Sequence, residues 1–203
     1  MKSNSPVLCL ASVSPRRRAL LAQIGVPHIV AGADIDETTL SGETPRDYVE
    51  RMARLKALAI RDKGETLPVL AADTTVVLDD VIYGKPRDRA DGIAMLGRLS
   101  GRTHEVLTAV AFADRRGVTL RLSVSSVRFR TLTAQECAAY WETGEPRDKA
   151  GGYAVQGAAA VFIESLSGSY SGVMGLPLFE TAELLRAAGV RYWEGGNGAG
   201  AHC

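Results

Sequence analysis

Apolar positions along the chain follow two different periods, and the alternation between them is typical of an α/β protein. Continuous apolar runs indicate buried strands, whereas apolar positions that recur every three or four residues indicate helices. By these criteria strands are predicted at 7–11, near 29–30, around Asp73, and at 105–113, 119–129 and 158–163. Helices are predicted at 15–24, from 45, at 88–99, from 134 and at 177–188. The short connections between them favour one mixed sheet with flanking helices.

Local signals place the ends of several of these elements. Ser14 and Pro15 suit the N-cap and first position of the first helix, and Gly25 suits its end. Thr44-Pro45 opens the second helix, in which one set of apolar residues recurs at helical spacing: Tyr48, Met52, Leu55 and Ala59. The stretch from Thr133 to Glu136 matches a capping box, and residues 114–117 read as a hairpin turn.

Length and charge limit the kinds of partner. A chain of 203 residues suits a single domain, placed here at 1–190, with two lobes around a cleft and a disordered Gly-rich tail at 191–203. Its 24 basic and 23 acidic residues leave a net charge of +1, which argues against binding to nucleic acid or to a membrane surface. Three scattered cysteines and three scattered histidines predict neither disulfides nor a zinc site. A cytoplasmic protein is expected, and any metal would be Mg²⁺ or Mn²⁺ on oxygen ligands.

Asp73 is a carboxylate within an apolar, β-branched run. Burial disfavours the charged form of such a group unless something pairs with it. A Lys85-Pro86 turn follows the next short strand and could return a cation beside the acid. This combination suits a metal or phosphate centre, and the alternative is an ordinary aspartate that caps a turn at the end of a strand.

Three arginines, Arg16, Arg17 and Arg18, occupy the first turn of the first helix. Cations are disfavoured there by roughly 0.3–1 kcal/mol, because the helix dipole is positive at that end. Their presence makes sense if an anion such as a phosphate binds to the helix N-terminus. The alternative is a solvated basic face, which would account for one or two of the three.

Two further segments carry polar residues of interest. Residues 34–37 end in Glu37 and offer carboxylates to a metal or a water, although loop acids of this kind are commonly just solvated. Residues 148–157 contain the pair Gly151-Gly152, which allows close approach of the backbone, and then Gln156 at the start of an apolar strand. A glutamine amide can match the N3–H and carbonyl edge of uracil or thymine, but it can also rotate to serve cytosine or be a simple turn residue.

Seven motifs, in this order along the chain, resemble the Maf family of nucleotide pyrophosphatases: residues 10–17, 35–37, 72–74, 84–86, 99–104, 148–151 and 175–178. The resemblance extends from about Leu8 to Gly189. Residues 73–75 and 152–157 are similar to the branch that hydrolyses dTTP and UTP. The family implies an elongated α/β fold, related to the inosine-triphosphate pyrophosphatases, with the nucleotide in a central cleft. A divalent cation and a homodimer are also implied.

The same resemblance implies roles for individual residues. Asp73 would be the acid at the reacting centre, as general base or as metal anchor together with Glu37. Substrate choice is tied to the positions of Arg16, Thr74 and Gln156. The charged residues Glu37, Lys56 and Lys85 would line the cleft, and the first motif adds Ser12, Ser14 and Arg17 to the substrate-binding set. Lys56 lies on the flank of the second helix's apolar stripe, from which it could reach inward or remain a surface lysine.

The expected activity is hydrolysis of dTTP and UTP to the monophosphate and pyrophosphate. Two alternatives stay open. A related enzyme could act on 7-methyl-GTP or another modified nucleotide, with Gln156 merely structural. A protein of a different class could sense nucleotides and regulate cell division without turnover. No Ser-His-Asp or Cys-His arrangement and no phosphate-binding Walker loop competes with these readings.

Overall fold

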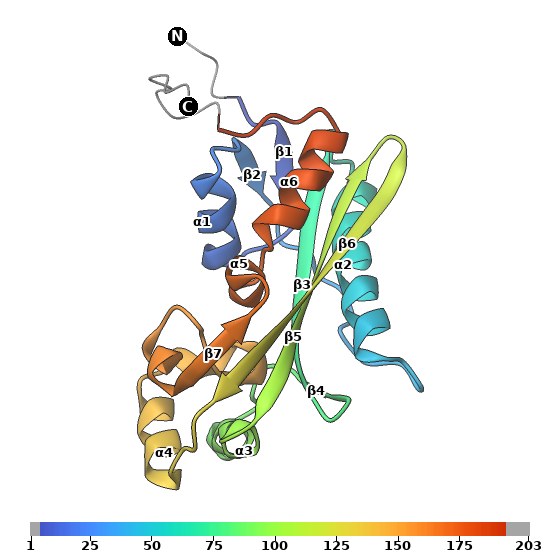
Figure 1. Ribbon diagram of the computed structural model, residues 1–203. Helices are drawn as coiled ribbons and strands as arrows, with labels where there is room; N and C mark the ends of the chain where they lie inside the picture. Colours follow the sequence, from blue (N-terminus) through green and yellow to red (C-terminus); the bar gives the residue numbers. More distant parts are fainter. Residues whose placement is uncertain (1–4, 194–203) are drawn as a thin grey trace, which may run out of the picture.

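The computed structural model describes residues 5–193 and confirms the mixed α/β architecture (Figure 1). Its seven-stranded sheet has the order β2-β1-β3-β5-β6-β7, and β4 pairs with the far end of β3. The strands are β1 (Leu8–Leu10), β2 (His28–Val30), β3 (Val69–Leu78), β4 (Val81–Tyr83), β5 (Thr103–Asp114), β6 (Gly117–Phe129) and β7 (Ile163–Ser167). β1 runs parallel to β2 and β3, and the other pairs are antiparallel.

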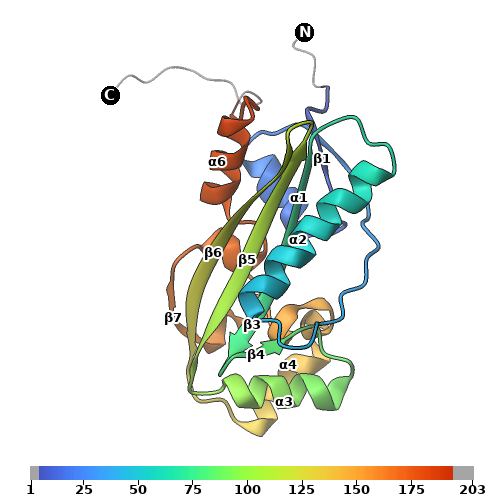
Figure 2. The ribbon, with the colours of Figure 1, turned by 90° about the vertical axis from the view of Figure 1, so that its right-hand side faces the viewer.

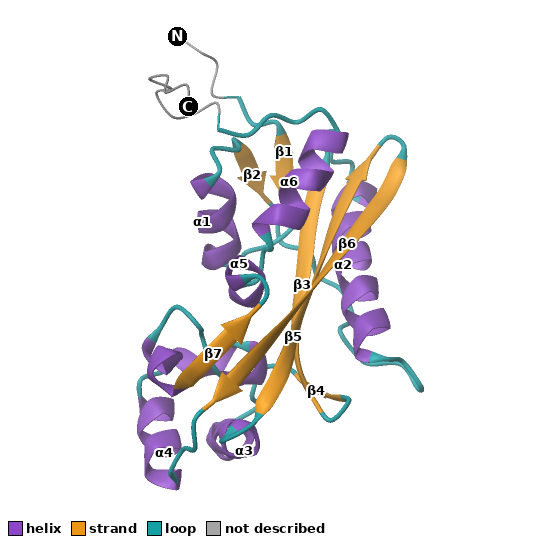
Figure 3. Ribbon diagram, viewed as in Figure 1, coloured by secondary structure: helices purple, strands orange, loops and turns teal. Residues whose placement is uncertain are grey.

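Helices cover both faces of the long strands and close the far end of the sheet (Figures 1 and 2). They are α1 (Pro15–Gln23), α2 (Pro45–Asp62), α3 (Arg89–Leu99), α4 (Ala134–Glu142), α5 (Tyr170–Met174) and α6 (Leu178–Ala187), with short 3₁₀ turns η1 (Glu145–Asp148), η2 (Ala150–Gly152) and η3 (Ala158–Phe162). Figure 3 shows how the long strands β3, β5 and β6 run through an elongated molecule, with α3 and α4 at one end. Among residues 5–193, no helix combines the length and the apolar character needed to cross a bilayer.

The core consists of three hydrophobic clusters along the sheet. One packs α2 against the face of β3 and β5 that carries Ala71 and Ala109, and a second packs α1 and α6 against the opposite face. The third fills the far end around Phe129, between β4, α3 and α4. This arrangement leaves the middle of β3 between the two ends of the molecule, where the site lies.

Two predictions made from the apolar pattern are wrong in detail. Residues 158–162 form the 3₁₀ turn η3 rather than a strand, and β7 begins only at Ile163. An apolar run alone does not distinguish a strand from a tight helical turn. In α2 the buried stripe is rotated from the predicted one: Leu55 is 36% exposed, and the residues facing the core are Val49, Met52, Ala53, Ala57 and Ile60.

Several predicted element ends are confirmed. The capping box of α4 forms between Thr133 and Glu136, and α1 begins at Pro15 with Ser14 as N-cap.

Part of the segment predicted as a tail packs on the fold, because the Trp193 amide donates to the Ile24 carbonyl at 2.7 Å and Tyr192 contacts the α1–α6 cluster. The rest of that segment, 194–203, lies outside the described residues.

Candidate active site

A cavity of about 480 Å³ lies against the middle of β3. Its walls come from segments that are far apart in the sequence, including the β1–α1 loop, α2, the turn after β4 and the 148–156 segment. All ten residues predicted for the site line it: Ser12, Ser14, Arg16, Arg17, Glu37, Lys56, Asp73, Thr74, Lys85 and Gln156. The fold therefore brings the predicted set to one place.

A gap in the pairing of β3 creates this cavity. One edge of β3 pairs with β1 at Val69 and Leu70, and the same edge pairs with β4 from Val76 to Leu78. Between these two partners, residues 71–75 pair only with β5, on the opposite edge, among the described strands. Side chains alternate along a strand, so Asp73 and Thr75 face α2 whereas Thr74 and Val76 face the other side. The cavity reaches both faces of the sheet through the gap.

On the α2 side, one lysine joins two carboxylates. The Lys56 ammonium lies 2.6 Å from Asp73 Oδ1 and 2.6 Å from Glu37 Oε1. The side chains of Lys56 and Asp73 are only 12% and 11% exposed. Charges removed from water to this extent are stable only when paired, so each partner depends on the others. Lys56 thus reaches inward, because the rotated stripe of α2 puts residue 56 near the core face.

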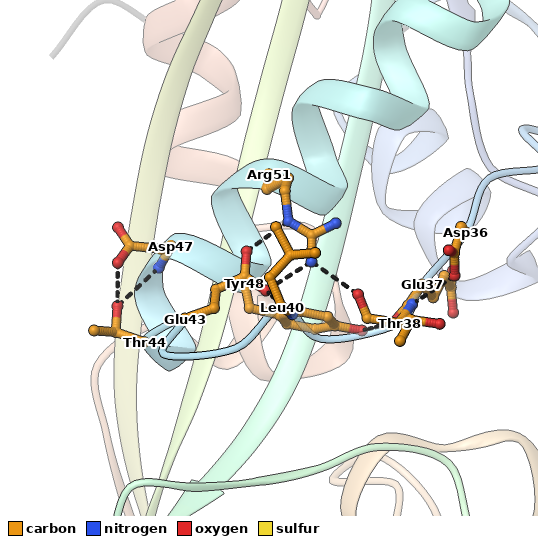
Figure 4. A network of polar contacts seen from close by, with 9 residues as sticks. All are labelled: Asp36, Glu37, Thr38, Leu40, Glu43, Thr44, Asp47, Tyr48 and Arg51. Atoms are coloured by element: carbon orange, nitrogen blue, oxygen red, sulfur yellow. Dashed lines mark hydrogen bonds and ion pairs between the residues drawn. The ribbon is translucent and has the colours of Figure 1, made fainter.

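Hydrogen bonds and an ion pair between α2 and the loop that carries Glu37 hold this residue in position (Figure 4). The Tyr48 hydroxyl donates to the Glu37 carbonyl at 3.1 Å, and Arg51 donates to Glu43 at 2.5 and 2.6 Å and to the Thr38 carbonyl at 3.0 Å. Burial raises the pKa of Glu37, but its hydrogen bond to Lys56 and the charges of Lys56, Lys85 and Arg17 outweigh this effect. The pKa of Glu37 consequently lies below its usual value. The carboxylate therefore stays ionised at neutral pH.

The three arginines of α1 have different environments. Arg17 donates through Nε to the Gly175 carbonyl at 2.7 Å, through Nη1 to Ser12 Oγ at 3.3 Å and through Nη2 to Thr74 Oγ1 at 3.2 Å. Burial lowers the pKa of Arg17, and the charge of Asp73 partly offsets this; the guanidinium remains protonated. Arg16 also lines the cavity, and its Nη1 lies 3.8 Å from Asp148 Oδ2. Arg18 is exposed.

The N-terminus of α1 faces the same cavity. Ser14 is its N-cap but makes no capping bond with its side chain, and its amide donates to Ser12 Oγ at 3.3 Å. Pro15 has no N–H, and the Arg18 amide donates to the Ser14 carbonyl at 3.2 Å, so the Arg16 and Arg17 amides are the ones left at this end, which is the positive end of the helix dipole. Together with Arg16 and Arg17 they form a place for an anion, as the arginine pattern indicated.

The opposite side of β3 offers an apolar wall. Val76, Val106, Tyr153 and Val173 line the cavity there, next to Thr74. Gly151 permits this packing: its φ is +68°, and a Cβ at this position would lie 2.8 Å from Val76 Cγ2. Gln156 is exposed on the same rim, just before η3, whose first amides at Ala158 and Ala159 donate to the Glu145 carboxylate. A flat ring could pack against this wall with a polar residue at either side.

Residues missed in the sequence also contribute. Asp148 and Lys149 line the cavity and pair with each other, although they were noted only as part of a motif. The hydroxyl of Thr108, within β5, lies 3.0 Å from that of Thr74. A threonine in the otherwise apolar run 106–113 was a signal that could have drawn attention to it.

A buried histidine supports the apolar wall from behind. His104 is 2% exposed, and its Nε2 lies 2.8 Å from the Tyr153 hydroxyl. Burial lowers the pKa of His104 to about 4, so the ring is neutral in the folded protein at neutral pH.

The histidine should make the stability of the protein depend on pH. Because the pKa of His104 is lower in the folded state than in the unfolded one, the unfolded chain binds the extra proton first as the pH falls. We expect its contribution, ~3 kcal/mol at most, to be present above pH ~6.5 and lost between there and pH ~4. His104→Gln should flatten this part of the pH dependence of the unfolding free energy, measured by denaturant titration. His28→Gln, at a half-buried position, serves as the matched control; equal slopes in all three proteins would contradict the assignment.

The fit of a divalent cation can be judged from the acids. The described residues contain no group of three or more His, Cys, Asp or Glu side chains that could hold a metal by themselves. Asp73 and Glu37 nevertheless converge on one point, the Lys56 ammonium, and each has a second carboxylate oxygen. Mg²⁺ is commonly bound by one or two carboxylates together with substrate phosphates and waters. The residues therefore fit a cation that binds together with a polyphosphate.

Comparison with known proteins agrees with this geometry. Residues 7–188 match the family model described as Maf-like protein. The dTTP/UTP pyrophosphatase of Saccharophagus degradans is 51% identical over 195 residues, covering 94% of this chain and 93% of the relative. The protein of the same name from Alkalilimnicola ehrlichii is 55% identical over 186 residues, covering 89% and 92%. The solved structure of the Staphylococcus aureus Ham1 protein overlaps 60% of this chain and 71% of its own, with a TM-score of 0.43 and 17% identity. The chain belongs to the Maf family.

Proposed function

We propose that this protein is a nucleoside triphosphate pyrophosphatase that hydrolyses dTTP and UTP to the monophosphate and pyrophosphate. The observation that carries the proposal is the Glu37–Lys56–Asp73 ion-pair group, which lies in the same cavity as the cations of α1. The relatives also support the proposal. Five of them that are 50–55% identical to this chain over nearly their whole length are named dTTP/UTP pyrophosphatase.

The triphosphate binds where positive charge gathers. A nucleoside triphosphate carries roughly four negative charges, which must be compensated before a nucleophile can approach. Arg16 and Lys85 line the cavity together with Ser12 and Ser14 at the N-terminus of α1, and Arg17 adds its charge from the side of Thr74. Backbone amides and charged side chains of this kind bind phosphate oxygens without further rearrangement.

The reaction takes place at the α-phosphorus. A water oxygen attacks phosphorus, Asp73 accepts a proton from that water, and the α–β bridging oxygen leaves with its electron pair as pyrophosphate. Lys56 holds Asp73 in place through their ion pair, and Lys85 stabilises the charge that develops on the leaving group. Asp73 and Glu37 would hold the Mg²⁺ or Mn²⁺ ion. When bound, such a cation supplies Lewis-acid polarisation of the phosphoryl oxygens.

The base packs on the apolar wall of Val76, Val106 and Tyr153. Gln156 at the rim donates from its amide to the carbonyl at position 4 of uracil or thymine, where cytosine carries an amino group instead. An exposed glutamine can make this contact without moving the fold, because only its side chain needs to reorient.

Release of pyrophosphate from purified protein tests the proposal directly. UTP and dTTP should be hydrolysed in the presence of Mg²⁺ or Mn²⁺, with much lower rates on CTP and 7-methyl-GTP. Chelation by EDTA should stop turnover, and added metal should restore it. A thermal shift with nucleotide in the absence of any product would instead favour a nucleotide sensor.

Gln156→Ala should reduce the preference for UTP over CTP. We expect the ratio of their kcat/KM values to fall about tenfold, the value of one hydrogen bond of ~1.4 kcal/mol. The unfolding temperature should not change, because Gln156 is exposed. Gln135→Ala, at an exposed position on α4 far from the cavity, is the control. An unchanged ratio would assign Gln156 a structural role only.

Location in the cytoplasm and assembly as a homodimer are part of the same proposal. The described cysteines, Cys9 and Cys137, are buried free thiols, which fits a reducing compartment. The dimer is supported by the family resemblance, and the oligomeric state is measured by light scattering.

A further inference from the structure

A line of hydroxyl groups crosses from the cavity into the sheet. Thr108 of β5 is directly opposite Thr74 of β3 in the antiparallel register and is fully buried. Its Oγ1 lies 3.0 Å from Thr74 Oγ1 and 2.8 Å from the carbonyl oxygen of Gly172 in α5. On the cavity side, Thr74 Oγ1 lies 3.2 Å from Arg17 Nη2.

The number of hydrogens determines the direction of each bond in this line. A threonine hydroxyl has one hydrogen to donate and two lone pairs to accept with, whereas a carbonyl can only accept. Thr108 therefore gives its hydrogen to Gly172. The contact between the two threonines is a hydrogen bond only if Thr74 donates to Thr108. Thr74 accepts from Arg17, so its remaining capacity is a single lone pair.

Next to the acceptor lone pair of Thr74, Arg17 presents only hydrogen-bond donors. A guanidinium has five N–H donors and no acceptor. Three of the five are engaged by Gly175, Ser12 and Thr74, and the remaining two are available to a ligand. Thr74 and Arg17 thus offer an acceptor beside donors, next to the apolar wall that includes Val76 and Val106.

We propose that Thr108 is a positioning residue for base selection, because it fixes Thr74 as an acceptor toward the substrate. This inference rests on the proposed function. Uracil and thymine carry an N3–H donor beside a carbonyl, so N3–H donates to Thr74 while Arg17 donates to the carbonyl at position 2. Cytosine has a lone pair at N3, which would face the lone pair of Thr74. Thr74 and Arg17 together therefore select a pyrimidine with a hydrogen on N3.

Thr108→Val tests the inference because it keeps the shape of the side chain and removes the hydroxyl. Without its acceptor, the Thr74 hydrogen can turn toward the cavity and donate to N3 of cytosine. We expect kcat/KM for CTP to rise and that for UTP to fall, so that their ratio changes about tenfold. A gain on CTP is an outcome that loss of structure does not produce.

Matched variants separate this effect from packing. Thr108→Ser retains the hydroxyl and should keep the selectivity of the natural protein. Thr181→Val makes the same chemical change at another fully buried threonine, whose hydroxyl has no partner and does not line the cavity; its selectivity should be unchanged. Should the valine variant fail to fold, Thr108→Ala compared with Thr108→Ser isolates the hydroxyl in the same way.

A second probe examines the substrate side of the contact. UTP methylated on N3 has lost the donor, and the natural protein should hydrolyse it about tenfold less efficiently than UTP. Thr108→Val should discriminate less between these two nucleotides. Binding of the α,β-methylene analogues of UTP and CTP, measured by calorimetry, gives the same ratio without turnover.

The outcomes distinguish this inference from the proposed function. If no nucleotide releases pyrophosphate, the proposed function fails, and the calorimetric ratio still decides the role of Thr108. If the natural protein is active but Thr108→Val lowers UTP and CTP turnover equally, or changes neither, the role in base selection is overturned. A shift toward CTP that Thr108→Ser does not share supports it.

Discussion

Asp73→Asn should remove almost all pyrophosphate release while leaving nucleotide binding intact. The amide keeps the size of the side chain and can still accept from Lys56, but it cannot take a proton from the attacking water. Loss of a general base commonly costs a factor of ~10²–10⁴ in rate. Binding should be retained or tightened, since the cations that hold the triphosphate remain and one nearby negative charge is lost. Turnover and calorimetry with the α,β-methylene analogue of UTP measure the two effects separately.

Asp79→Asn provides the control for this substitution. Asp79 follows the same strand, is exposed, and pairs with Arg102 at 2.7 Å far from the cations of α1. Its φ of +52° is a conformation that asparagine tolerates well. This variant should retain normal turnover. An Asp73→Asn protein with normal turnover would refute the role given to Asp73.

Lys56→Met should affect both activity and stability. Removal of the ammonium leaves Asp73 and Glu37 facing each other without the cation that pairs with both. Removal of one partner from a buried ion pair costs roughly 3–5 kcal/mol. Glu37 is 48% exposed on its side chain, so solvent screening reduces this figure, and we expect about 2–3 kcal/mol. Turnover should fall at least as far as in Asp73→Asn.

The pH dependence of that loss identifies its cause. Protonation of either carboxylate relieves their repulsion, so the folded variant gains protons more readily than its unfolded chain. The difference in unfolding free energy between natural protein and variant should therefore be largest near pH 7–8 and shrink toward pH 5, in denaturant titrations. Lys63→Met, at the exposed C-cap of the same helix, controls for the loss of one surface charge. A deficit independent of pH would point to lost packing instead.

The sequence predicted the fold class well, and the residues that it predicted for the site meet in one cavity, because both predictions depend on strong local signals. Buried strands and capped helices are visible as apolar runs and as pairs such as Thr133 and Glu136. All ten residues predicted for the site line the cavity, although they are only part of its wall. The sequence could not show which way each side chain points. Of three adjacent arginines, Arg17 contacts Thr74 and Arg16 does not, a difference set by how α1 packs against α5.

Other features depended on tertiary contacts that have no local signature. The turn η3 forms where its amides meet Glu145, a residue thirteen positions earlier in the chain. The buried stripe of α2 is set by the sheet it covers, so Leu55 is outside and Lys56 reaches the cavity. Thr108 gained significance only when β5 placed it opposite Thr74.

The interrupted pairing of β3 also bears on how the specificity of such a fold can change. The main-chain groups on the edge of residues 71–75 that no described strand pairs with are the same whichever side chains occupy those positions, so no substitution other than proline deletes them. Selectivity for a base can then be altered by exchanging side chains on one face, while the acid group on the other face is left untouched. A scaffold divided in this way permits divergence of substrates without loss of the underlying chemistry.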